Sequence, residues 1–126
     1  MISIATVSVQ PTFAQESEFE ARKYVNAEGD TLPYRLLLPS EFEEGKEYPV
    51  VLFLHGAGER GDDNEAQLKW GVAHFAEQEF RQDHPAIVIA PQSPEDEYWT
   101  NLNWREEGVR LSEEPRKPLA MAYELL

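Results

Sequence analysis

The chain has 126 residues and a mass of 14.5 kDa, which is the size of one ordinary domain and too little for two. Its 41% hydrophobic and 28% charged residues are typical of a globular domain, and its net charge of −13 without a basic cluster argues against a nucleic acid or an anionic membrane surface as partner. The absence of cysteine excludes disulfides, thiolate metal sites and cysteine nucleophiles.

The N-terminal segment begins with a weakly apolar run, Ile2 to Val9, that is too short to span a bilayer, so we expect no stable membrane insertion. Thr12 and Ala14 have the small-residue spacing that precedes a signal-peptide cleavage site, but no Lys or Arg comes before Arg22. Residues 1–15 are therefore either the remnant of a secretory signal peptide or a disordered extension, and residues 16–126 form the domain. The signal-peptide alternative predicts an extracytoplasmic protein, periplasmic or secreted.

The domain opens with two stretches rich in aromatic and β-branched or aliphatic residues, Phe19 to Val25 and Thr31 to Leu38. A cluster of turn-forming residues, Asn26 to Asp30, separates them, which predicts an antiparallel hairpin. The charged segment from Ser40 to Tyr48 then predicts a surface loop.

An unbroken apolar run, Val50 to His55, follows Pro49 and predicts a strand that is covered on both faces in a parallel sheet. A glycine-rich turn, Gly56 to Gly61, comes directly after it.

The next segment has the pattern of an amphipathic helix that runs to about Phe80. Asn64 and Gln67 have the spacing of a helix N-cap and its reciprocal partner. One face of this predicted helix is apolar and consists of Leu68, Val72, Phe75 and Ala76.

A second buried strand is predicted at Ala86 to Ala90, and a long irregular stretch is expected from Gln92 to Lys117. Pro118 is well placed in the first turn of a last helix, whose expected apolar face consists of Leu119, Ala122, Tyr123 and Leu126. Strands that alternate with helices predict an α/β fold with a parallel sheet.

The glycine turn matches the dinucleotide-binding pattern G-x-G-x-x-G at Gly56, Gly58 and Gly61. The two acids after it, Asp62 and Asp63, would repel a pyrophosphate, and the next strand ends without the carboxylate that binds a ribose. A dinucleotide-binding module is therefore an alternative that the context disfavours.

Three segments together resemble the α/β-hydrolase superfamily, and within it secreted or periplasmic esterases and peptidase-like enzymes related to dienelactone hydrolases, carboxylesterases and prolyl oligopeptidases. The segments are Tyr34 to Pro39, Tyr48 to Asp62 and Ile87 to Gln92. The resemblance implies the N-terminal part of an α/β-hydrolase domain, with an antiparallel hairpin followed by parallel strands and helices. It also implies a serine hydrolase that cleaves an ester or peptide bond of a small substrate and needs no cofactor.

In this family the turn after the first buried strand holds backbone N–H donors for the oxyanion of the tetrahedral intermediate. The resemblance assigns that donor to the N–H of Ala57, in a turn shaped by Gly56 and Gly58, and makes His55 a structural residue. We further expect Glu59, Arg60 and Asp62 to form a local set of ion pairs and hydrogen bonds that holds the loop.

The reacting groups of such an enzyme are missing from the sequence. A serine hydrolase needs G-x-S-x-G and then an acid and a histidine, and no serine of this chain has that setting. We therefore expect a chain truncated before the nucleophile, inactive on its own and poorly soluble because Val50 to Leu54 would expose a strand edge. A catalytically dead α/β scaffold used for binding is the other alternative.

Two tryptophans after the second buried strand, Trp99 and Trp104, either line an acyl or leaving-group pocket or cover the core. The three histidines lack the spacing of zinc ligands, so we expect no metal site.

Overall fold

The computed structural model describes residues 16, 18–105, 108–111 and 113–126, without the side chains of residues 102–112. The predicted signal-peptide remnant or extension at residues 1–15 lies outside the described residues.

The expected hairpin is confirmed, because β1 (Glu20–Val25) and β2 (Thr31–Leu37) pair antiparallel. The Asn26 side chain closes the turn, since its Oδ1 accepts hydrogen bonds from the N–H groups of Glu28 at 3.0 Å and Asp30 at 2.8 Å. Gly29 has a φ of 87°, which a residue with a side chain rarely adopts.

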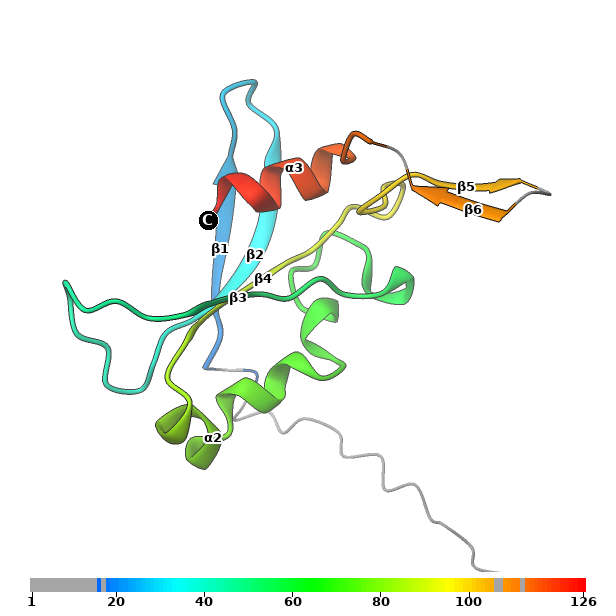
Figure 1. Ribbon diagram of the computed structural model, residues 1–126. Coiled ribbons are helices and arrows are strands. Elements are labelled where there is room, and N and C mark those ends of the chain that lie inside the picture. Colours follow the sequence, from blue (N-terminus) through cyan, green and yellow to red (C-terminus); the bar gives the residue numbers. More distant parts are fainter. Residues whose placement is uncertain (1–15, 17, 106–107, 112) are drawn as a thin grey trace, which may run out of the picture.

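The central sheet has the order β1-β2-β4-β3 and is mixed (Figure 1). β4 (Ile87–Pro91) pairs antiparallel with β2, whereas β3 (Val50–Leu52) pairs parallel with β4. β3 ends earlier than the predicted run to His55, although the N–H of Phe53 still donates to the carbonyl of Ile89 at 2.9 Å. The prediction of a parallel sheet therefore holds in the described residues for the β3–β4 pair only.

The prediction of one helix from residue 64 to residue 80 is wrong. The chain instead forms two 3-10 turns, η2 (Ala66–Leu68) and η3 (Val72–Ala76), and one short helix, α2 (Gln78–Asp83). Gly71 breaks the pattern with a φ of 83° and a ψ of −44°, which no helix contains. The core residues were nevertheless well predicted, because Leu68, Val72 and Ala76 are buried.

The two faces of the sheet are covered by different elements. On one face, η2 and η3 pack against the sheet through a cluster that includes Leu68, Val72, Leu37 and Val88. On the other face, α3 (Lys117–Glu124) packs through Met121 and Ala122 against Leu32. Figure 1 shows α2 and α3 on opposite sides of the sheet, which is the layered arrangement of an α/β fold.

The last helix is found where the sequence predicts it, but its buried face is different. Pro118, Met121 and Ala122 are buried, while Tyr123 and Leu126 are 75% and 62% exposed. The helix packs against both strands of the first hairpin, and the Tyr24 hydroxyl of β1 donates to a Glu124 carboxylate oxygen at 2.7 Å.

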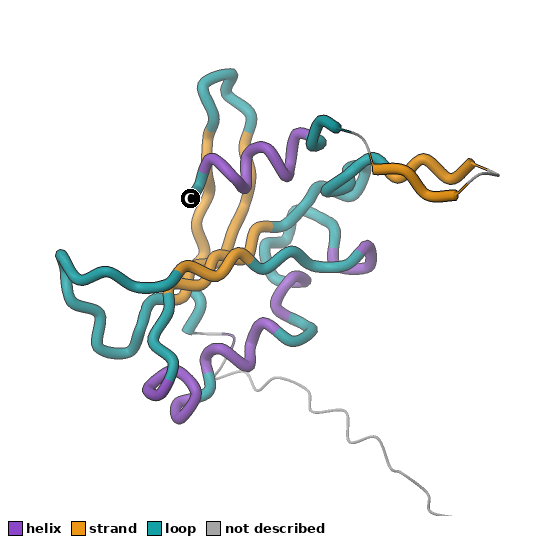
Figure 2. The backbone as a smooth tube through the Cα atoms, in the orientation of Figure 1, coloured by secondary structure: helices purple, strands orange, loops and turns teal. Residues whose placement is uncertain are grey.

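The stretch from Gln92 to Lys117, expected to be irregular throughout, contains a second hairpin. β5 (Leu102–Arg105) and β6 (Gly108–Leu111) pair antiparallel with each other and not with the central sheet. The segment between β4 and β5 is a loop, as expected (Figure 2). The alternating residue types of the two short strands are a signal that could have identified this hairpin.

Candidate functional site

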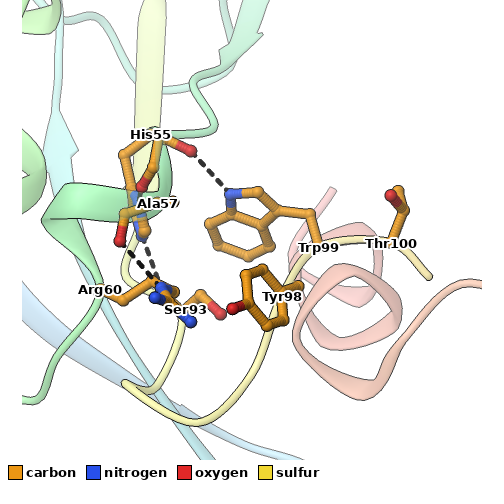
Figure 3. A pocket seen from close by; sticks show the side chains of 8 residues that line it. His55, Ala57, Arg60, Ser93, Tyr98, Trp99 and Thr100 are labelled. Atoms are coloured by element: carbon orange, nitrogen blue, oxygen red, sulfur yellow. Dashed lines mark hydrogen bonds between the residues drawn. The ribbon is translucent and has the colours of Figure 1, made fainter. Parts of the chain in front are cut away.

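A pocket of about 240 Å³ lies where the chain leaves β3 and β4 at their carboxyl ends (Figure 3). Ligands of open α/β sheets bind at this end of the strands. The pocket is lined by residues from the turn after β3 and the loop after β4, namely His55, Gly56, Ala57, Arg60, Ser93, Tyr98, Trp99 and Thr100.

His55 is buried beneath the pocket, and both of its ring nitrogens bond to backbone groups. Its Nδ1–H donates to the carbonyl of Gly56 at 2.6 Å, and its Nε2 accepts from the N–H of Ser93 at 2.9 Å. This pattern requires the neutral ring with the proton on Nδ1. Burial lowers the pKa of His55 and so favours the same neutral form. His55 therefore ties the turn after β3 to the loop after β4.

The bond from His55 also fixes the peptide unit between Gly56 and Ala57. Because a trans peptide is planar, its C=O and N–H point in opposite directions. The C=O is directed at the imidazole, so the N–H of Ala57 is directed away from it. Ala57 is exposed, lines the pocket and is the first residue of a 3-10 turn, η1 (Ala57–Glu59), where an N–H has no intrahelical acceptor.

The glycines of the turn differ in what they require. Gly56 and Gly58 do not adopt a positive φ, and a Cβ on Gly58 would have no atom within 4 Å. Gly61 has a φ of 154°, and a Cβ there would lie 3.3 Å from the Gln92 amide nitrogen. The backbone conformation therefore favours glycine most clearly at Gly61. At Gly58 a side chain would project into open space.

The loop from residue 59 to residue 64 is held by the fully buried side chain of Gln92, which the sequence did not single out. Its Nε2 donates to the carbonyl of Glu59 at 3.1 Å and to Asp63 Oδ1 at 2.8 Å, and its Oε1 accepts from the N–H of Asn64 at 2.7 Å. Of the expected set, Arg60 bonds within the turn to the carbonyl of Ala57, and Glu59 takes part through its backbone carbonyl. The carboxylate that bonds in this loop is that of Asp63 and not that of Asp62.

Asp63, and not Asn64, is the side chain that accepts backbone N–H groups just before η2, whose N-cap residue is Glu65. The Oδ1 of Asp63 accepts from the N–H groups of Glu65 and Ala66 at 2.9 and 3.1 Å, and these bonds lower the pKa of Asp63. Asn64 has a φ of 54°, and its Oδ1 accepts from Gln67 at 2.6 Å. The predicted Asn64–Gln67 contact is therefore present, but it does not cap a helix.

Aromatic side chains form the outer wall of the pocket. The Trp99 indole N–H donates to the carbonyl of His55 at 2.9 Å, and the Trp99 and His55 rings have centroids 5.0 Å apart. The Arg60 guanidinium lies 4.3 Å from the centre of the Tyr98 ring, and its Nε donates to the carbonyl of Ala57 at 2.8 Å. Trp99 thus lines the pocket, whereas Trp104 belongs to β5 and its side chain lies outside the described part.

No group of His, Asp or Glu in the described residues is arranged to hold a metal ion. No helix in the same part of the chain is long and apolar enough to cross a bilayer.

The fold is similar to that of a solved esterase structure. A crystal structure of a thermostable esterase superposes with a TM-score of 0.73 at 36% sequence identity and covers 86% of this chain. The chain spans only 29% of that esterase's length. No protein-family model and no curated protein sequence matches the chain. At the level of overall topology, the chain is therefore consistent with part of an esterase-like α/β-hydrolase fold.

Proposed function

We propose that this chain forms the oxyanion-hole portion of a serine hydrolase that acts on carboxylic esters of small molecules. The peptide unit fixed by His55 supports the proposal most directly. Its N–H at Ala57 borders the pocket and is free of an intrahelical acceptor, as a donor for a developing oxyanion must be.

A preorganised donor is worth more than a mobile one because it does not have to reorient when charge develops. The imidazole and the Gln92 side chain hold the turn from two sides, so the Ala57 N–H keeps its direction in the absence of substrate. A hydrogen bond to the carbonyl of the same peptide unit also polarises its N–H.

The preference for esters over peptides follows from the esterase that the chain resembles at 36% identity. Peptide bonds remain the alternative that the wider family resemblance allows. A small-molecule substrate is in keeping with a pocket of about 240 Å³.

No serine in this sequence has the surroundings of a catalytic nucleophile. None lies in G-x-S-x-G, and the nearest serine to the site, Ser93, contacts His55 through its backbone N–H and not through its hydroxyl. We therefore propose that the 126 residues are inactive alone and that the nucleophile, acid and catalytic histidine come from other sequence.

A chimera tests this proposal. Residues 16–126 would replace the matching segment of the thermostable esterase, and hydrolysis of p-nitrophenyl acetate would be followed. We expect turnover well above the uncatalysed rate from the chimera and none from the 126-residue chain. Turnover by the isolated chain, or a folded but inactive chimera, would contradict the proposal, and the second result would favour the dead scaffold.

No described feature favours the dinucleotide-binding alternative. The turn after β3 leads into 3-10 turns, and the first α-helix that follows begins only at Gln78. A pyrophosphate would therefore have no helix N-terminus at the glycine turn.

A further inference from the structure

Three successive carbonyl groups of the glycine turn each accept a hydrogen bond from a side chain. The carbonyl of His55 accepts from the indole N–H of Trp99 at 2.9 Å, and the carbonyl of Gly56 accepts from the His55 ring at 2.6 Å. The carbonyl of Ala57 accepts from Nε of Arg60 at 2.8 Å. Side chains therefore orient three consecutive peptide units in a stretch that belongs to no strand or α-helix.

The first two of these bonds together set the direction of the Ala57 N–H. That direction depends on the dihedral angles of Gly56, which has a φ of −79° and a ψ of −179° and no Cβ to restrict either angle. The two angles relate the peptide unit that ends at Ala57 to the unit before it. The His55 ring holds the carbonyl of the later unit, and Trp99 holds the carbonyl of the earlier one. Both angles of Gly56 are fixed only when both units are held.

Trp99 differs from the other two donors in its place in the chain. His55 and Arg60 belong to the turn, whereas Trp99 lies in the loop after β4, 44 residues beyond His55 (Figure 3). Its bond therefore ties the first carbonyl of the turn to another element. The Trp99 ring also packs against the His55 ring, with centroids 5.0 Å apart. One side chain thus supports both the earlier peptide unit and the imidazole that orients the later one.

Trp99 also lines the pocket, but a role as a wall does not account for its polar atom. An apolar wall needs only a ring, which phenylalanine provides as well. The indole N–H is the one hydrogen-bonding group of the side chain, and it bonds to the backbone of the turn. The bond points to a second role for this residue, in holding the turn.

We propose that Trp99 is a positioning residue of the glycine turn. Its indole N–H holds the carbonyl of His55 and thereby keeps the N–H of Ala57 in a fixed direction. That this N–H stabilises an oxyanion rests on the proposed function. The restriction of the turn by Trp99 does not, so the two claims have separate tests.

The first test uses the full chain and needs no catalysis. Trp99→Phe removes the donor and keeps an aromatic ring. The 15N heteronuclear NOE of the Gly56, Ala57 and Gly58 amides reports their motion on the picosecond-to-nanosecond timescale. We expect lower NOE values in Trp99→Phe than in the unmodified chain, because the earlier peptide unit is released. Unchanged values in folded Trp99→Phe would overturn the proposal.

Trp70→Phe is the matched control for this comparison. It is the same substitution at a tryptophan that is 48% exposed and does not line the pocket, and it should leave the three NOE values unchanged. The unmodified chain supplies a second measurement in case Trp99→Phe does not fold. The bonded indole proton of Trp99 should exchange with solvent more slowly than that of Trp70. Equal or faster exchange at Trp99 would overturn the proposal.

The esterase chimera separates a positioning role from that of a pocket wall. We expect Trp99→Phe to lower kcat for p-nitrophenyl acetate about 3- to 10-fold, the usual effect of one hydrogen bond, and to change KM little because a ring still lines the pocket. Trp70→Phe should change neither constant. A raised KM with unchanged kcat would overturn the proposal in favour of a wall. An unsubstituted chimera without activity would contradict the proposed function alone, and the NOE comparison then decides the role of Trp99.

Discussion

His55 shows how one side chain can organise a site without taking part in the chemistry. A catalytic base needs a ring nitrogen that is free to accept a substrate or nucleophile proton. Both nitrogens of His55 are occupied by the backbone at Gly56 and Ser93. Its contribution is to position the peptide that precedes Ala57, and the contribution depends on the ring being neutral.

The first prediction concerns pH. Burial lowers the pKa of His55 below its ordinary 6.5, so the unfolded chain binds a proton more readily than the folded one. The stability that neutral His55 contributes is therefore complete above pH 6.5 and is lost as pH falls toward its folded pKa. Urea unfolding should show the unmodified chain losing stability as the pH falls below about 6.5, and His55→Gln losing less.

The matched control is His84→Gln, because His84 is exposed, whereas the ring of His74 lies 2.8 Å from a Glu77 carboxylate oxygen. This variant should follow the pH dependence of the unmodified chain. The stability that the lowered pKa values of Asp30 and Asp63 contribute is constant over this pH range, because it is lost only as the pH falls below their ordinary pKa of 3.8. The same pH slope in His55→Gln as in the unmodified chain would contradict the role of the neutral ring.

At the level of elements, the segment after the glycine turn is divided by the backbone of Gly71. The combination of φ 83° and ψ −44° is accessible to glycine and is strained for any residue with a Cβ. The turns on the two sides of this break both pack into one core cluster, η2 through Leu68 and η3 through Val72.

We predict that Gly71→Ala destabilises the chain by about 1 to 3 kcal/mol, the cost of a strained backbone conformation. An added Cβ would approach the Phe53 ring only to 4.0 Å, so no steric clash contributes. Gly58→Ala is the matched control, because that glycine has open space and no positive φ, and its stability should stay the same or rise by up to about 1 kcal/mol. Equal unfolding midpoints in urea for both variants would refute this explanation of the broken helix.

The same segment shows what the sequence could and could not predict. Periodicity identified Leu68, Val72 and Ala76 as core residues correctly, because burial follows residue type whether the backbone is α or 3-10. The break was missed because a single glycine is compatible with a helical pattern. The hairpin β1–β2 was predictable from its local turn residues.

The candidate site was less predictable because its supporting contacts are remote in sequence. Gln92 bonds to Asn64, 28 residues away, and Ser93 bonds to His55 across 38 residues. No local pattern reports such pairs. The sequence could indicate the turn at Gly56 to Gly61 by resemblance, but only the fold brings the loop after β4 to it.

For the whole molecule, the sheet edge formed by β3 is the feature with the clearest consequence. In the described part of the chain β3 pairs only with β4, so its other edge has free backbone groups. Val50 and Leu54 along this segment are 49% and 38% exposed. An apolar edge of this kind favours pairing with another chain.

We predict that the isolated chain self-associates through this edge and that raising the salt concentration strengthens the association, because salt screens repulsion between chains of net charge −13. Val50→Lys should shift sedimentation-velocity profiles toward the monomer. Val25→Lys is the matched control, because Val25 is 55% exposed and lies on β1, the strand at the opposite edge of the sheet. That strand already carries the charged residues Glu20, Arg22 and Lys23. Equal effects of the two substitutions would rule out β3 as the associating edge.

The proposed oxyanion-hole function of the chain depends on the backbone N–H of Ala57. The substitution Ala57→Pro removes this N–H. Gly56 is extended with a ψ of −179°, which a following proline favours, and residue 57 begins a 3-10 turn, where proline is tolerated. Ala57→Ser keeps the N–H and serves as the control.

The deciding measurement is kcat for p-nitrophenyl acetate in the esterase chimera carrying each variant. We predict a loss of about 100- to 1,000-fold for Ala57→Pro, with KM changed little and Ala57→Ser within a few-fold of the unsubstituted chimera. A folded Ala57→Pro chimera that keeps its full kcat would contradict the assignment of this backbone N–H to the oxyanion hole.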